Sequence, residues 1–82
     1  MRILKEEIGA MDIRDAITAE YGAIHQYEGI YNNLENEDAK RILKSIIEEE
    51  KFHVGEFNQI IQILFPEESA LFDKGKAEAS NL

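Results

Sequence analysis

The sequence predicts an all-α protein, in which an antiparallel hairpin of two long helices is followed by a short C-terminal helix. Apolar residues recur at steps of three and four over two long stretches, which is the period of an amphipathic helix. The single proline, Pro66, and one polar cluster at residues 35–38 interrupt this pattern. With 82 residues, 44% of them hydrophobic, the chain fits one small helical unit.

The first long helix is expected to begin near Asp12, whose side chain can serve as its N-cap, after an N-terminal segment of residues 1–11. Its main apolar stripe includes one charged residue, Glu20. A second line of apolar residues follows the neighbouring face, at Ala16, Ala23 and Ile30. The main stripe consists of Ile13, Ile17, Glu20, Ile24, Tyr27, Tyr31 and Leu34.

The second long helix is expected to be capped by Asn36, with Glu37 and Asp38 in the first turn, where negative charge suits the helix dipole. Its main stripe is apolar except for Glu50 and His53. A second line, formed by Ile47, Val54 and Ile61, makes the apolar surface wider than one interface needs. The main stripe consists of Ala39, Leu43, Ile46, Glu50, His53, Phe57, Ile60 and Leu64.

Pro66 suits the first turn of a third helix, because its missing N–H would have no partner there. We expect this helix to be short, over residues 66–73, and residues 74–82 to form a flexible tail. The predicted organisation is therefore an N-terminal segment, a hairpin over 12–65, the short helix and the tail.

The three polar residues of the stripes are expected to meet at one level of the hairpin. A turn near residue 36 puts Glu20 and Glu50 within roughly 3 Å of the same height, at ~1.5 Å of rise per residue. Two carboxylates buried together repel each other and lose hydration, so the arrangement needs a compensating cation. The chain has no cysteine, which leaves oxygen and nitrogen ligands from Glu20, Glu50 and His53.

A lone hairpin leaves most of its apolar stripe exposed to water, so we expect two copies to pair. Pairing about a two-fold axis gives a four-helix bundle with two copies each of Glu20, Glu50 and His53 in its core. This is the ligand set of ferritin-like carboxylate sites, and its four carboxylates balance two divalent cations.

The run Glu20 to Tyr27, EYGAIHQY, and the motif Glu50-x-x-His53 thirty residues after Glu20 resemble the encapsulated ferritins and, more distantly, one half of a rubrerythrin. The resemblance covers residues 12–64. It implies a di-iron ferroxidase centre shared across a dimer interface, with Glu20, Glu50 and His53 as metal ligands and Tyr27 as a further catalytic residue. It also implies a ring of dimers enclosed by an encapsulin shell in the cytoplasm, where the iron is stored.

The sequence departs from that family at Ala19 and Gly22, which replace carboxylates that make an entry site there. Glu49 and His25 are the candidates for a secondary metal site instead. For Tyr27, an ordinary place in the core is the alternative to a role beside the metal. Zn, Mn or Ca can substitute for Fe with such ligands.

Three functions are consistent with these features. The first is a ferroxidase that supplies Fe(III) to an encapsulin compartment. The second is a rubrerythrin-like peroxide reductase, which would need an external reductant because the chain has no cysteine for a rubredoxin-type centre. The third is a non-enzymatic helical dimer stabilised by metal. A net charge of −8 argues against a nucleic-acid partner, and no N-terminal stretch has the apolar length of a membrane span.

Overall fold

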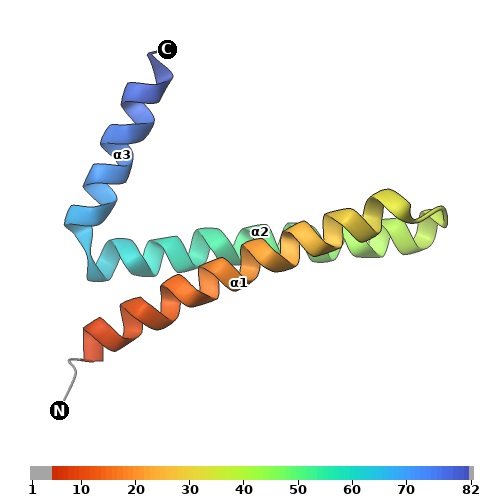
Figure 1. Ribbon diagram of the computed structural model, residues 1–82, viewed down its shortest axis with the longest axis horizontal. Helices are drawn as coiled ribbons and strands as arrows, with labels where there is room; N and C mark the ends of the chain where they lie inside the picture. Colours follow the sequence, from red (N-terminus) through yellow and green to blue (C-terminus); the bar gives the residue numbers. More distant parts are fainter. Residues whose placement is uncertain (1–4, 82) are drawn as a thin grey trace.

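The computed structural model describes the backbone of residues 5–81 and the side chains from residue 13 to residue 81. Over this range it contains three helices, α1 (Lys5–Asn33), α2 (Glu37–Leu64) and α3 (Pro66–Ser80). Figure 1 shows α1 and α2 lying side by side as an antiparallel hairpin, with α3 projecting steeply from its open end. The all-α prediction is confirmed.

The N-terminal half of the hairpin is longer than expected. α1 begins at Lys5, so Asp12 lies inside the helix and is not its N-cap, and residues 5–11 are not a separate segment. The stretch KEEIGAM contains no proline and only one glycine, and most of its residues favour a helix. The signal at Asp12 was therefore outweighed by the propensity of the residues before it.

The turn between α1 and α2 has the chemistry that the sequence predicts. Asn36 is the N-cap of α2, and its side-chain oxygen accepts a hydrogen bond from the backbone N–H of Ala39 at 2.9 Å. Glu37 and Asp38 occupy the first turn. The cap fixes where α2 starts, and with it the height of every residue along α2.

The bend before α3 is built from Phe65 and Pro66. Phe65 leaves the helical conformation while its N–H still bonds to the Ile61 carbonyl at 2.7 Å, and Pro66 opens α3 as expected. α3 then continues to Ser80, so the prediction of a short helix ending at residue 73 and a flexible tail was wrong for residues 74–80. The segment KGKAEAS is rich in helix formers, and no second proline stops it. Leu82 lies outside the described residues.

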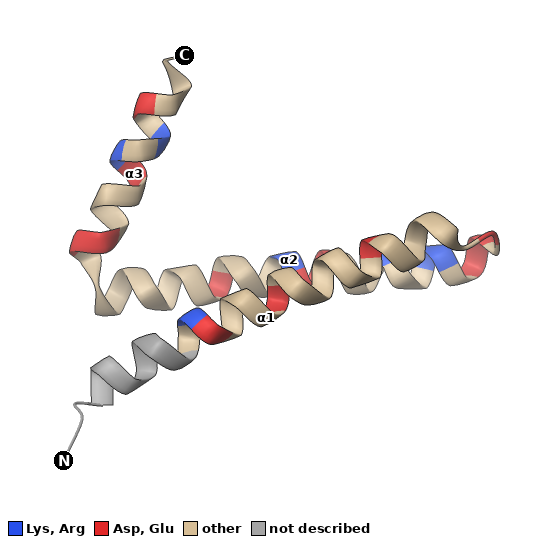
Figure 2. Ribbon diagram, viewed as in Figure 1, with Lys and Arg blue, Asp and Glu red and all other residues tan. Residues whose placement is uncertain are grey.

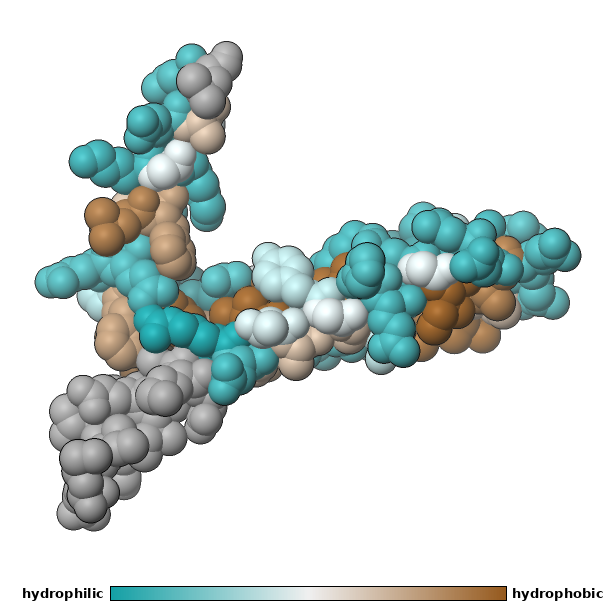
Figure 3. Space-filling model, in the orientation of Figure 1, coloured by the Kyte–Doolittle hydropathy of each residue, from teal (hydrophilic) through white to brown (hydrophobic). Residues whose placement is uncertain are grey.

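The hairpin packs on the second apolar line of α2. Three of the four residues that are buried in the described part of the chain, Ile47, Val54 and Ile61, belong to that line. Ile24 from α1 packs against Ile47 and Val54. The main stripe of α2 lies at the edge of this contact, where Ile46 and Ile60 remain 38% and 39% exposed. Apolar patches are therefore left on the surface between polar ones (Figure 3). The partly buried residues around the core are Ile17, Tyr27, Tyr31 and Leu43.

Charged residues are spread over all three helices (Figure 2). None of the helices, as far as they are described, has the length and apolarity to cross a bilayer.

Candidate metal centre

Glu20, Glu50 and His53 meet across the hairpin. Each offers one ligand atom, and these atoms all lie within 4.8 Å of one another. Glu20 comes from the middle of α1, whereas Glu50 and His53 lie one turn apart on α2. Within the described part of the chain, this is the one group of three or more metal-ligating side chains close enough to share an ion.

Packing on either side of these residues fixes their orientation. Ile17 and Ile24, about one turn before and after Glu20, pack in the core and set the rotation of α1. On α2, buried Ile47 and Val54 set the rotation that leaves Glu50 and His53 at the core edge. The site residues are thus held by helices rather than by loops.

Glu20 is the most enclosed of the three ligands. Its side chain is 18% exposed, and its Oε2 atom is buried without a hydrogen-bond partner. Its other oxygen, Oε1, lies 3.7 Å from Nδ1 of His53, which is longer than a hydrogen bond. An unpartnered buried carboxylate oxygen is costly, and a bound cation would remove that cost.

The centre is open on one side. The His53 side chain is 46% exposed, and Glu50 is only partly buried. Three protein ligands leave further coordination positions for solvent, substrate or another chain. Two carboxylates and one imidazole suit Fe(II), Mn(II) or Zn(II).

The other predicted site residues do not belong to this group of three ligands. Tyr27 packs partly buried against the cluster of Ile24, Ile47 and Val54, and its predicted catalytic role stays a prediction. Glu49 and His25 are exposed and do not join the group of three. A secondary metal site at Glu49 and His25 therefore stays a prediction.

Sequence reasoning did not identify the contacts of Arg14. Its guanidinium pairs with Glu68 and lies 5.5 Å from the centroid of the Phe65 ring. The partners are more than fifty positions apart in the chain, so no local pattern could have indicated them.

The family model that matches this chain is that of rubrerythrin, over residues 13–80. A ferritin-like–encapsulin shell fusion protein of Pyrococcus furiosus is 38% identical over 78 residues, which cover 95% of this chain and 22% of that protein. The encapsulin nanocompartment cargo protein EncC of Myxococcus xanthus is 41% identical over 61 residues, covering 74% of this chain and 47% of that protein. The chain thus spans less than half the length of either relative.

The fold is also similar to a solved structure. The crystal structure of the encapsulated ferritin domain from Pyrococcus furiosus superimposes with a TM-score of 0.90 at 34% identity, covering 100% of this chain and 84% of the other. The similarity therefore extends over α3 as well as the hairpin.

Proposed function

Because the chain belongs to the rubrerythrin family and is similar to an encapsulated ferritin domain, we propose that it oxidises Fe(II) to Fe(III) at a centre shared by two copies. The single observation that carries this proposal is the cluster of Glu20, Glu50 and His53, with one oxygen of Glu20 buried and unpartnered. The donors are those that iron prefers among oxygen and nitrogen ligands.

The apolar side of α2 next to the centre supports dimerisation. Ile42, Ile46 and Ile60 recur with His53 at steps of four and seven, so they share one side of the helix. Ile42 is 65% exposed, and the other two are more than one-third exposed. A second copy related by a two-fold axis would cover this side and contribute its own three ligands.

The shared centre would hold two divalent ions between four carboxylates. Iron held there would supply the one-electron chemistry, and four Fe(II) with one O₂ and four protons would yield four Fe(III) and two waters. Glu20 and Glu50 would anchor the ions and stabilise the more highly charged product, because hard carboxylate oxygens favour Fe(III). His53 would bind through Nδ1, the nitrogen that faces Glu20. Tyr27 would lie beside the ligands as a further catalytic residue.

The rubrerythrin match supports one alternative oxidant, hydrogen peroxide. Two Fe(II), one peroxide and two protons would give two Fe(III) and two waters, and an external reductant would restore Fe(II). Comparing the initial rate of Fe(II) oxidation by O₂ with that by anaerobically added peroxide separates these reactions. A much faster reaction with peroxide would favour the reductase.

We further propose an encapsulin shell as the partner that receives the Fe(III), because two relatives are named for encapsulin. Co-expression with a shell protein and analysis of the purified shells tests this. Cargo inside the shells is expected, and empty shells would contradict the assignment.

An anaerobic titration with Fe(II) tests the centre itself. We expect saturation at about one Fe(II) per chain, which is two per dimer, followed by rapid O₂ uptake on exposure to air. Tight binding of Zn(II) or Mn(II) with no O₂ uptake after Fe(II) loading would instead favour the non-enzymatic dimer.

A further inference from the structure

α3 has little to hold it in place within one chain. None of its described residues is buried, and its packing contacts are with α2. Leu71 and Phe72 are 68% and 53% exposed. A helix that buries no apolar face gains little stability or direction from packing. Figure 1 shows α3 projecting at a steep angle from the hairpin.

Arg14 on α1 contacts both sides of the bend that joins α2 to α3. Its guanidinium donates a hydrogen bond to Oε2 of Glu68 in the first turn of α3. The same guanidinium lies 5.5 Å from the centroid of the ring of Phe65, the residue that ends α2. One side chain thereby links all three helices at the bend.

We propose that Arg14 is a latch that fixes the direction of α3 relative to the hairpin. Without it, α3 is joined to the hairpin through the backbone of Phe65 and Pro66 and through its packing on the end of α2. The Arg14 and Glu68 side chains are 47% and 30% exposed, so the latch is sensitive to ionic strength.

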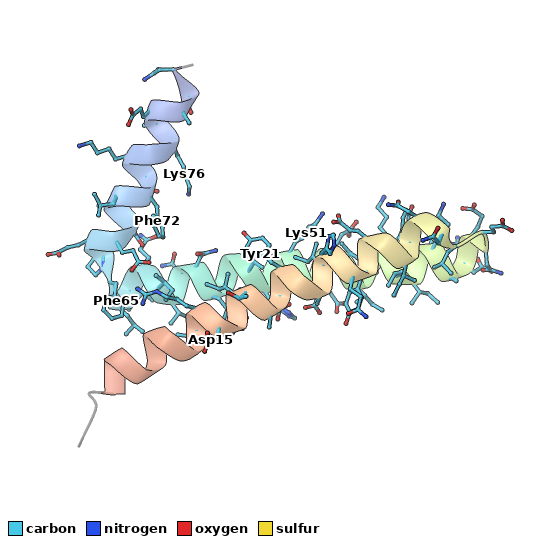
Figure 4. The ribbon with its side chains drawn as sticks, in the orientation of Figure 1. Asp15, Tyr21, Lys51, Phe65, Phe72 and Lys76 are labelled. Carbon is cyan, nitrogen blue, oxygen red and sulfur yellow. The ribbon has the colours of Figure 1, made fainter. Side chains whose placement is uncertain are left out.

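The latch also maintains a groove between α3 and the hairpin, of about 490 Å³. Tyr21 from α1 and Phe72 from α3 lie on the two sides of this groove (Figure 4). If α3 swings on its bend, this groove changes shape while the metal ligands, held in the hairpin, keep their positions. The latch therefore affects the shape of this groove and not the positions of the metal ligands.

Agreement with the crystal structure of the related ferritin domain supports a defined direction. A TM-score of 0.90 over 100% of this chain requires α3 to project in a similar way in both structures.

The absence of cysteine makes a distance measurement straightforward, because two introduced cysteines take spin labels without competition. Gln26→Cys on α1 and Ala77→Cys on α3 are both at exposed positions. Pulsed electron paramagnetic resonance, with labelled chains diluted into excess unlabelled protein, then measures the α1–α3 distance within one chain. We expect a narrow distribution for the parent and a broad one for Arg14→Ala and for the isosteric Glu68→Gln.

The matched control is Lys51→Ala, which removes the 3.4 Å ion pair with Glu28 between α1 and α2 and does not touch α3. Its distance distribution should stay narrow, and about 1 M salt should broaden that of the parent. Fe(II) stoichiometry should be unchanged in Arg14→Ala, which separates this proposal from the metal centre. A narrow distribution in both Arg14→Ala and Glu68→Gln would overturn the latch.

Discussion

Glu20 carries a destabilising feature that no other described side chain of the hairpin shares. Its Oε2 atom is buried without a partner, and Glu50 lies close enough to add a second carboxylate to the same small volume. The two carboxylates therefore lower the stability of the metal-free protein at a position where a bound cation would restore it. Such a residue is expected where binding, rather than folding, determined the choice of side chain.

Glu20→Gln should separate the effect of this carboxylate on stability from its effect on metal binding. Glutamine keeps the shape but removes the charge, so the metal-free protein should be at least as stable as the parent in thermal unfolding. Metal binding should be lost, because a neutral amide is a poor ligand for Fe(II). Glu28→Gln, at an exposed ion pair on the same helix, should leave metal binding unchanged. A clear drop in the metal-free unfolding temperature for Glu20→Gln would contradict this interpretation.

Asn36 is expected to matter for stability alone. Replacing it by alanine removes the hydrogen bond to the Ala39 N–H and should lower the free energy of unfolding by about 1 kcal/mol. Urea unfolding at equal protein concentration measures this. Asn33→Ala, which loses a hydrogen bond to the Gly29 carbonyl but no cap, is the control and should cost less. Equal losses of unfolding free energy in the two variants would show that the cap contributes no more than an ordinary side-chain hydrogen bond.

At the scale of the elements, the sequence predicts most of the hairpin, because its signals are local. The cap at Asn36 and the fixed helical rise bring Glu20 and Glu50 to one level without knowledge of the packing. The rotation of α2 was harder to predict, because two neighbouring apolar lines can each face α1. Packing on Ile47, Val54 and Ile61 leaves the main stripe at the open edge.

The helix ends and the direction of α3 could not be predicted for a different reason. Helix formers on both sides of Asp12 compete with its capping signal, and the same is true of the residues after Asp73. The direction of α3 depends on Arg14 and Glu68, which are distant in sequence. The use of the three predicted ligands for iron stays a prediction.

Two helical glycines should respond differently to alanine. Added methyl groups at Gly22 and at Gly75 would meet nothing within 4 Å in one chain, so each substitution should stabilise an isolated helix by about 1 kcal/mol. Gly75→Ala is expected to show this gain in thermal unfolding. Gly22→Ala should instead weaken self-association in sedimentation if another copy approaches α1 closely there. A stabilised and fully assembled Gly22→Ala protein would exclude that close approach.

At the scale of the whole molecule, a single chain is an open hairpin from which α3 projects, with a candidate metal centre at the open edge. An ion that binds only the paired hairpins stabilises the pair by mass action. Sedimentation velocity should therefore show stronger association with anaerobic Fe(II) than with EDTA. His25→Ala, away from the three ligands, should retain this dependence. Identical association under both conditions would argue against a centre at the interface.

We propose that Glu20, Glu50 and His53 form the iron-oxidising centre. The most direct measurement is the initial rate of O₂ uptake with Fe(II), at equal protein concentration, for the parent and for Glu20→Ala, His53→Ala and Glu49→Ala. In a two-fold site, each ligand substitution removes two ligands at once, so Glu20→Ala and His53→Ala should fall to near background. Glu49→Ala, whose exposed carboxylate lies outside the cluster, should change the rate at most modestly. Parent-like rates in Glu20→Ala and His53→Ala, together with an inactive Glu49→Ala, would contradict the assignment of the centre.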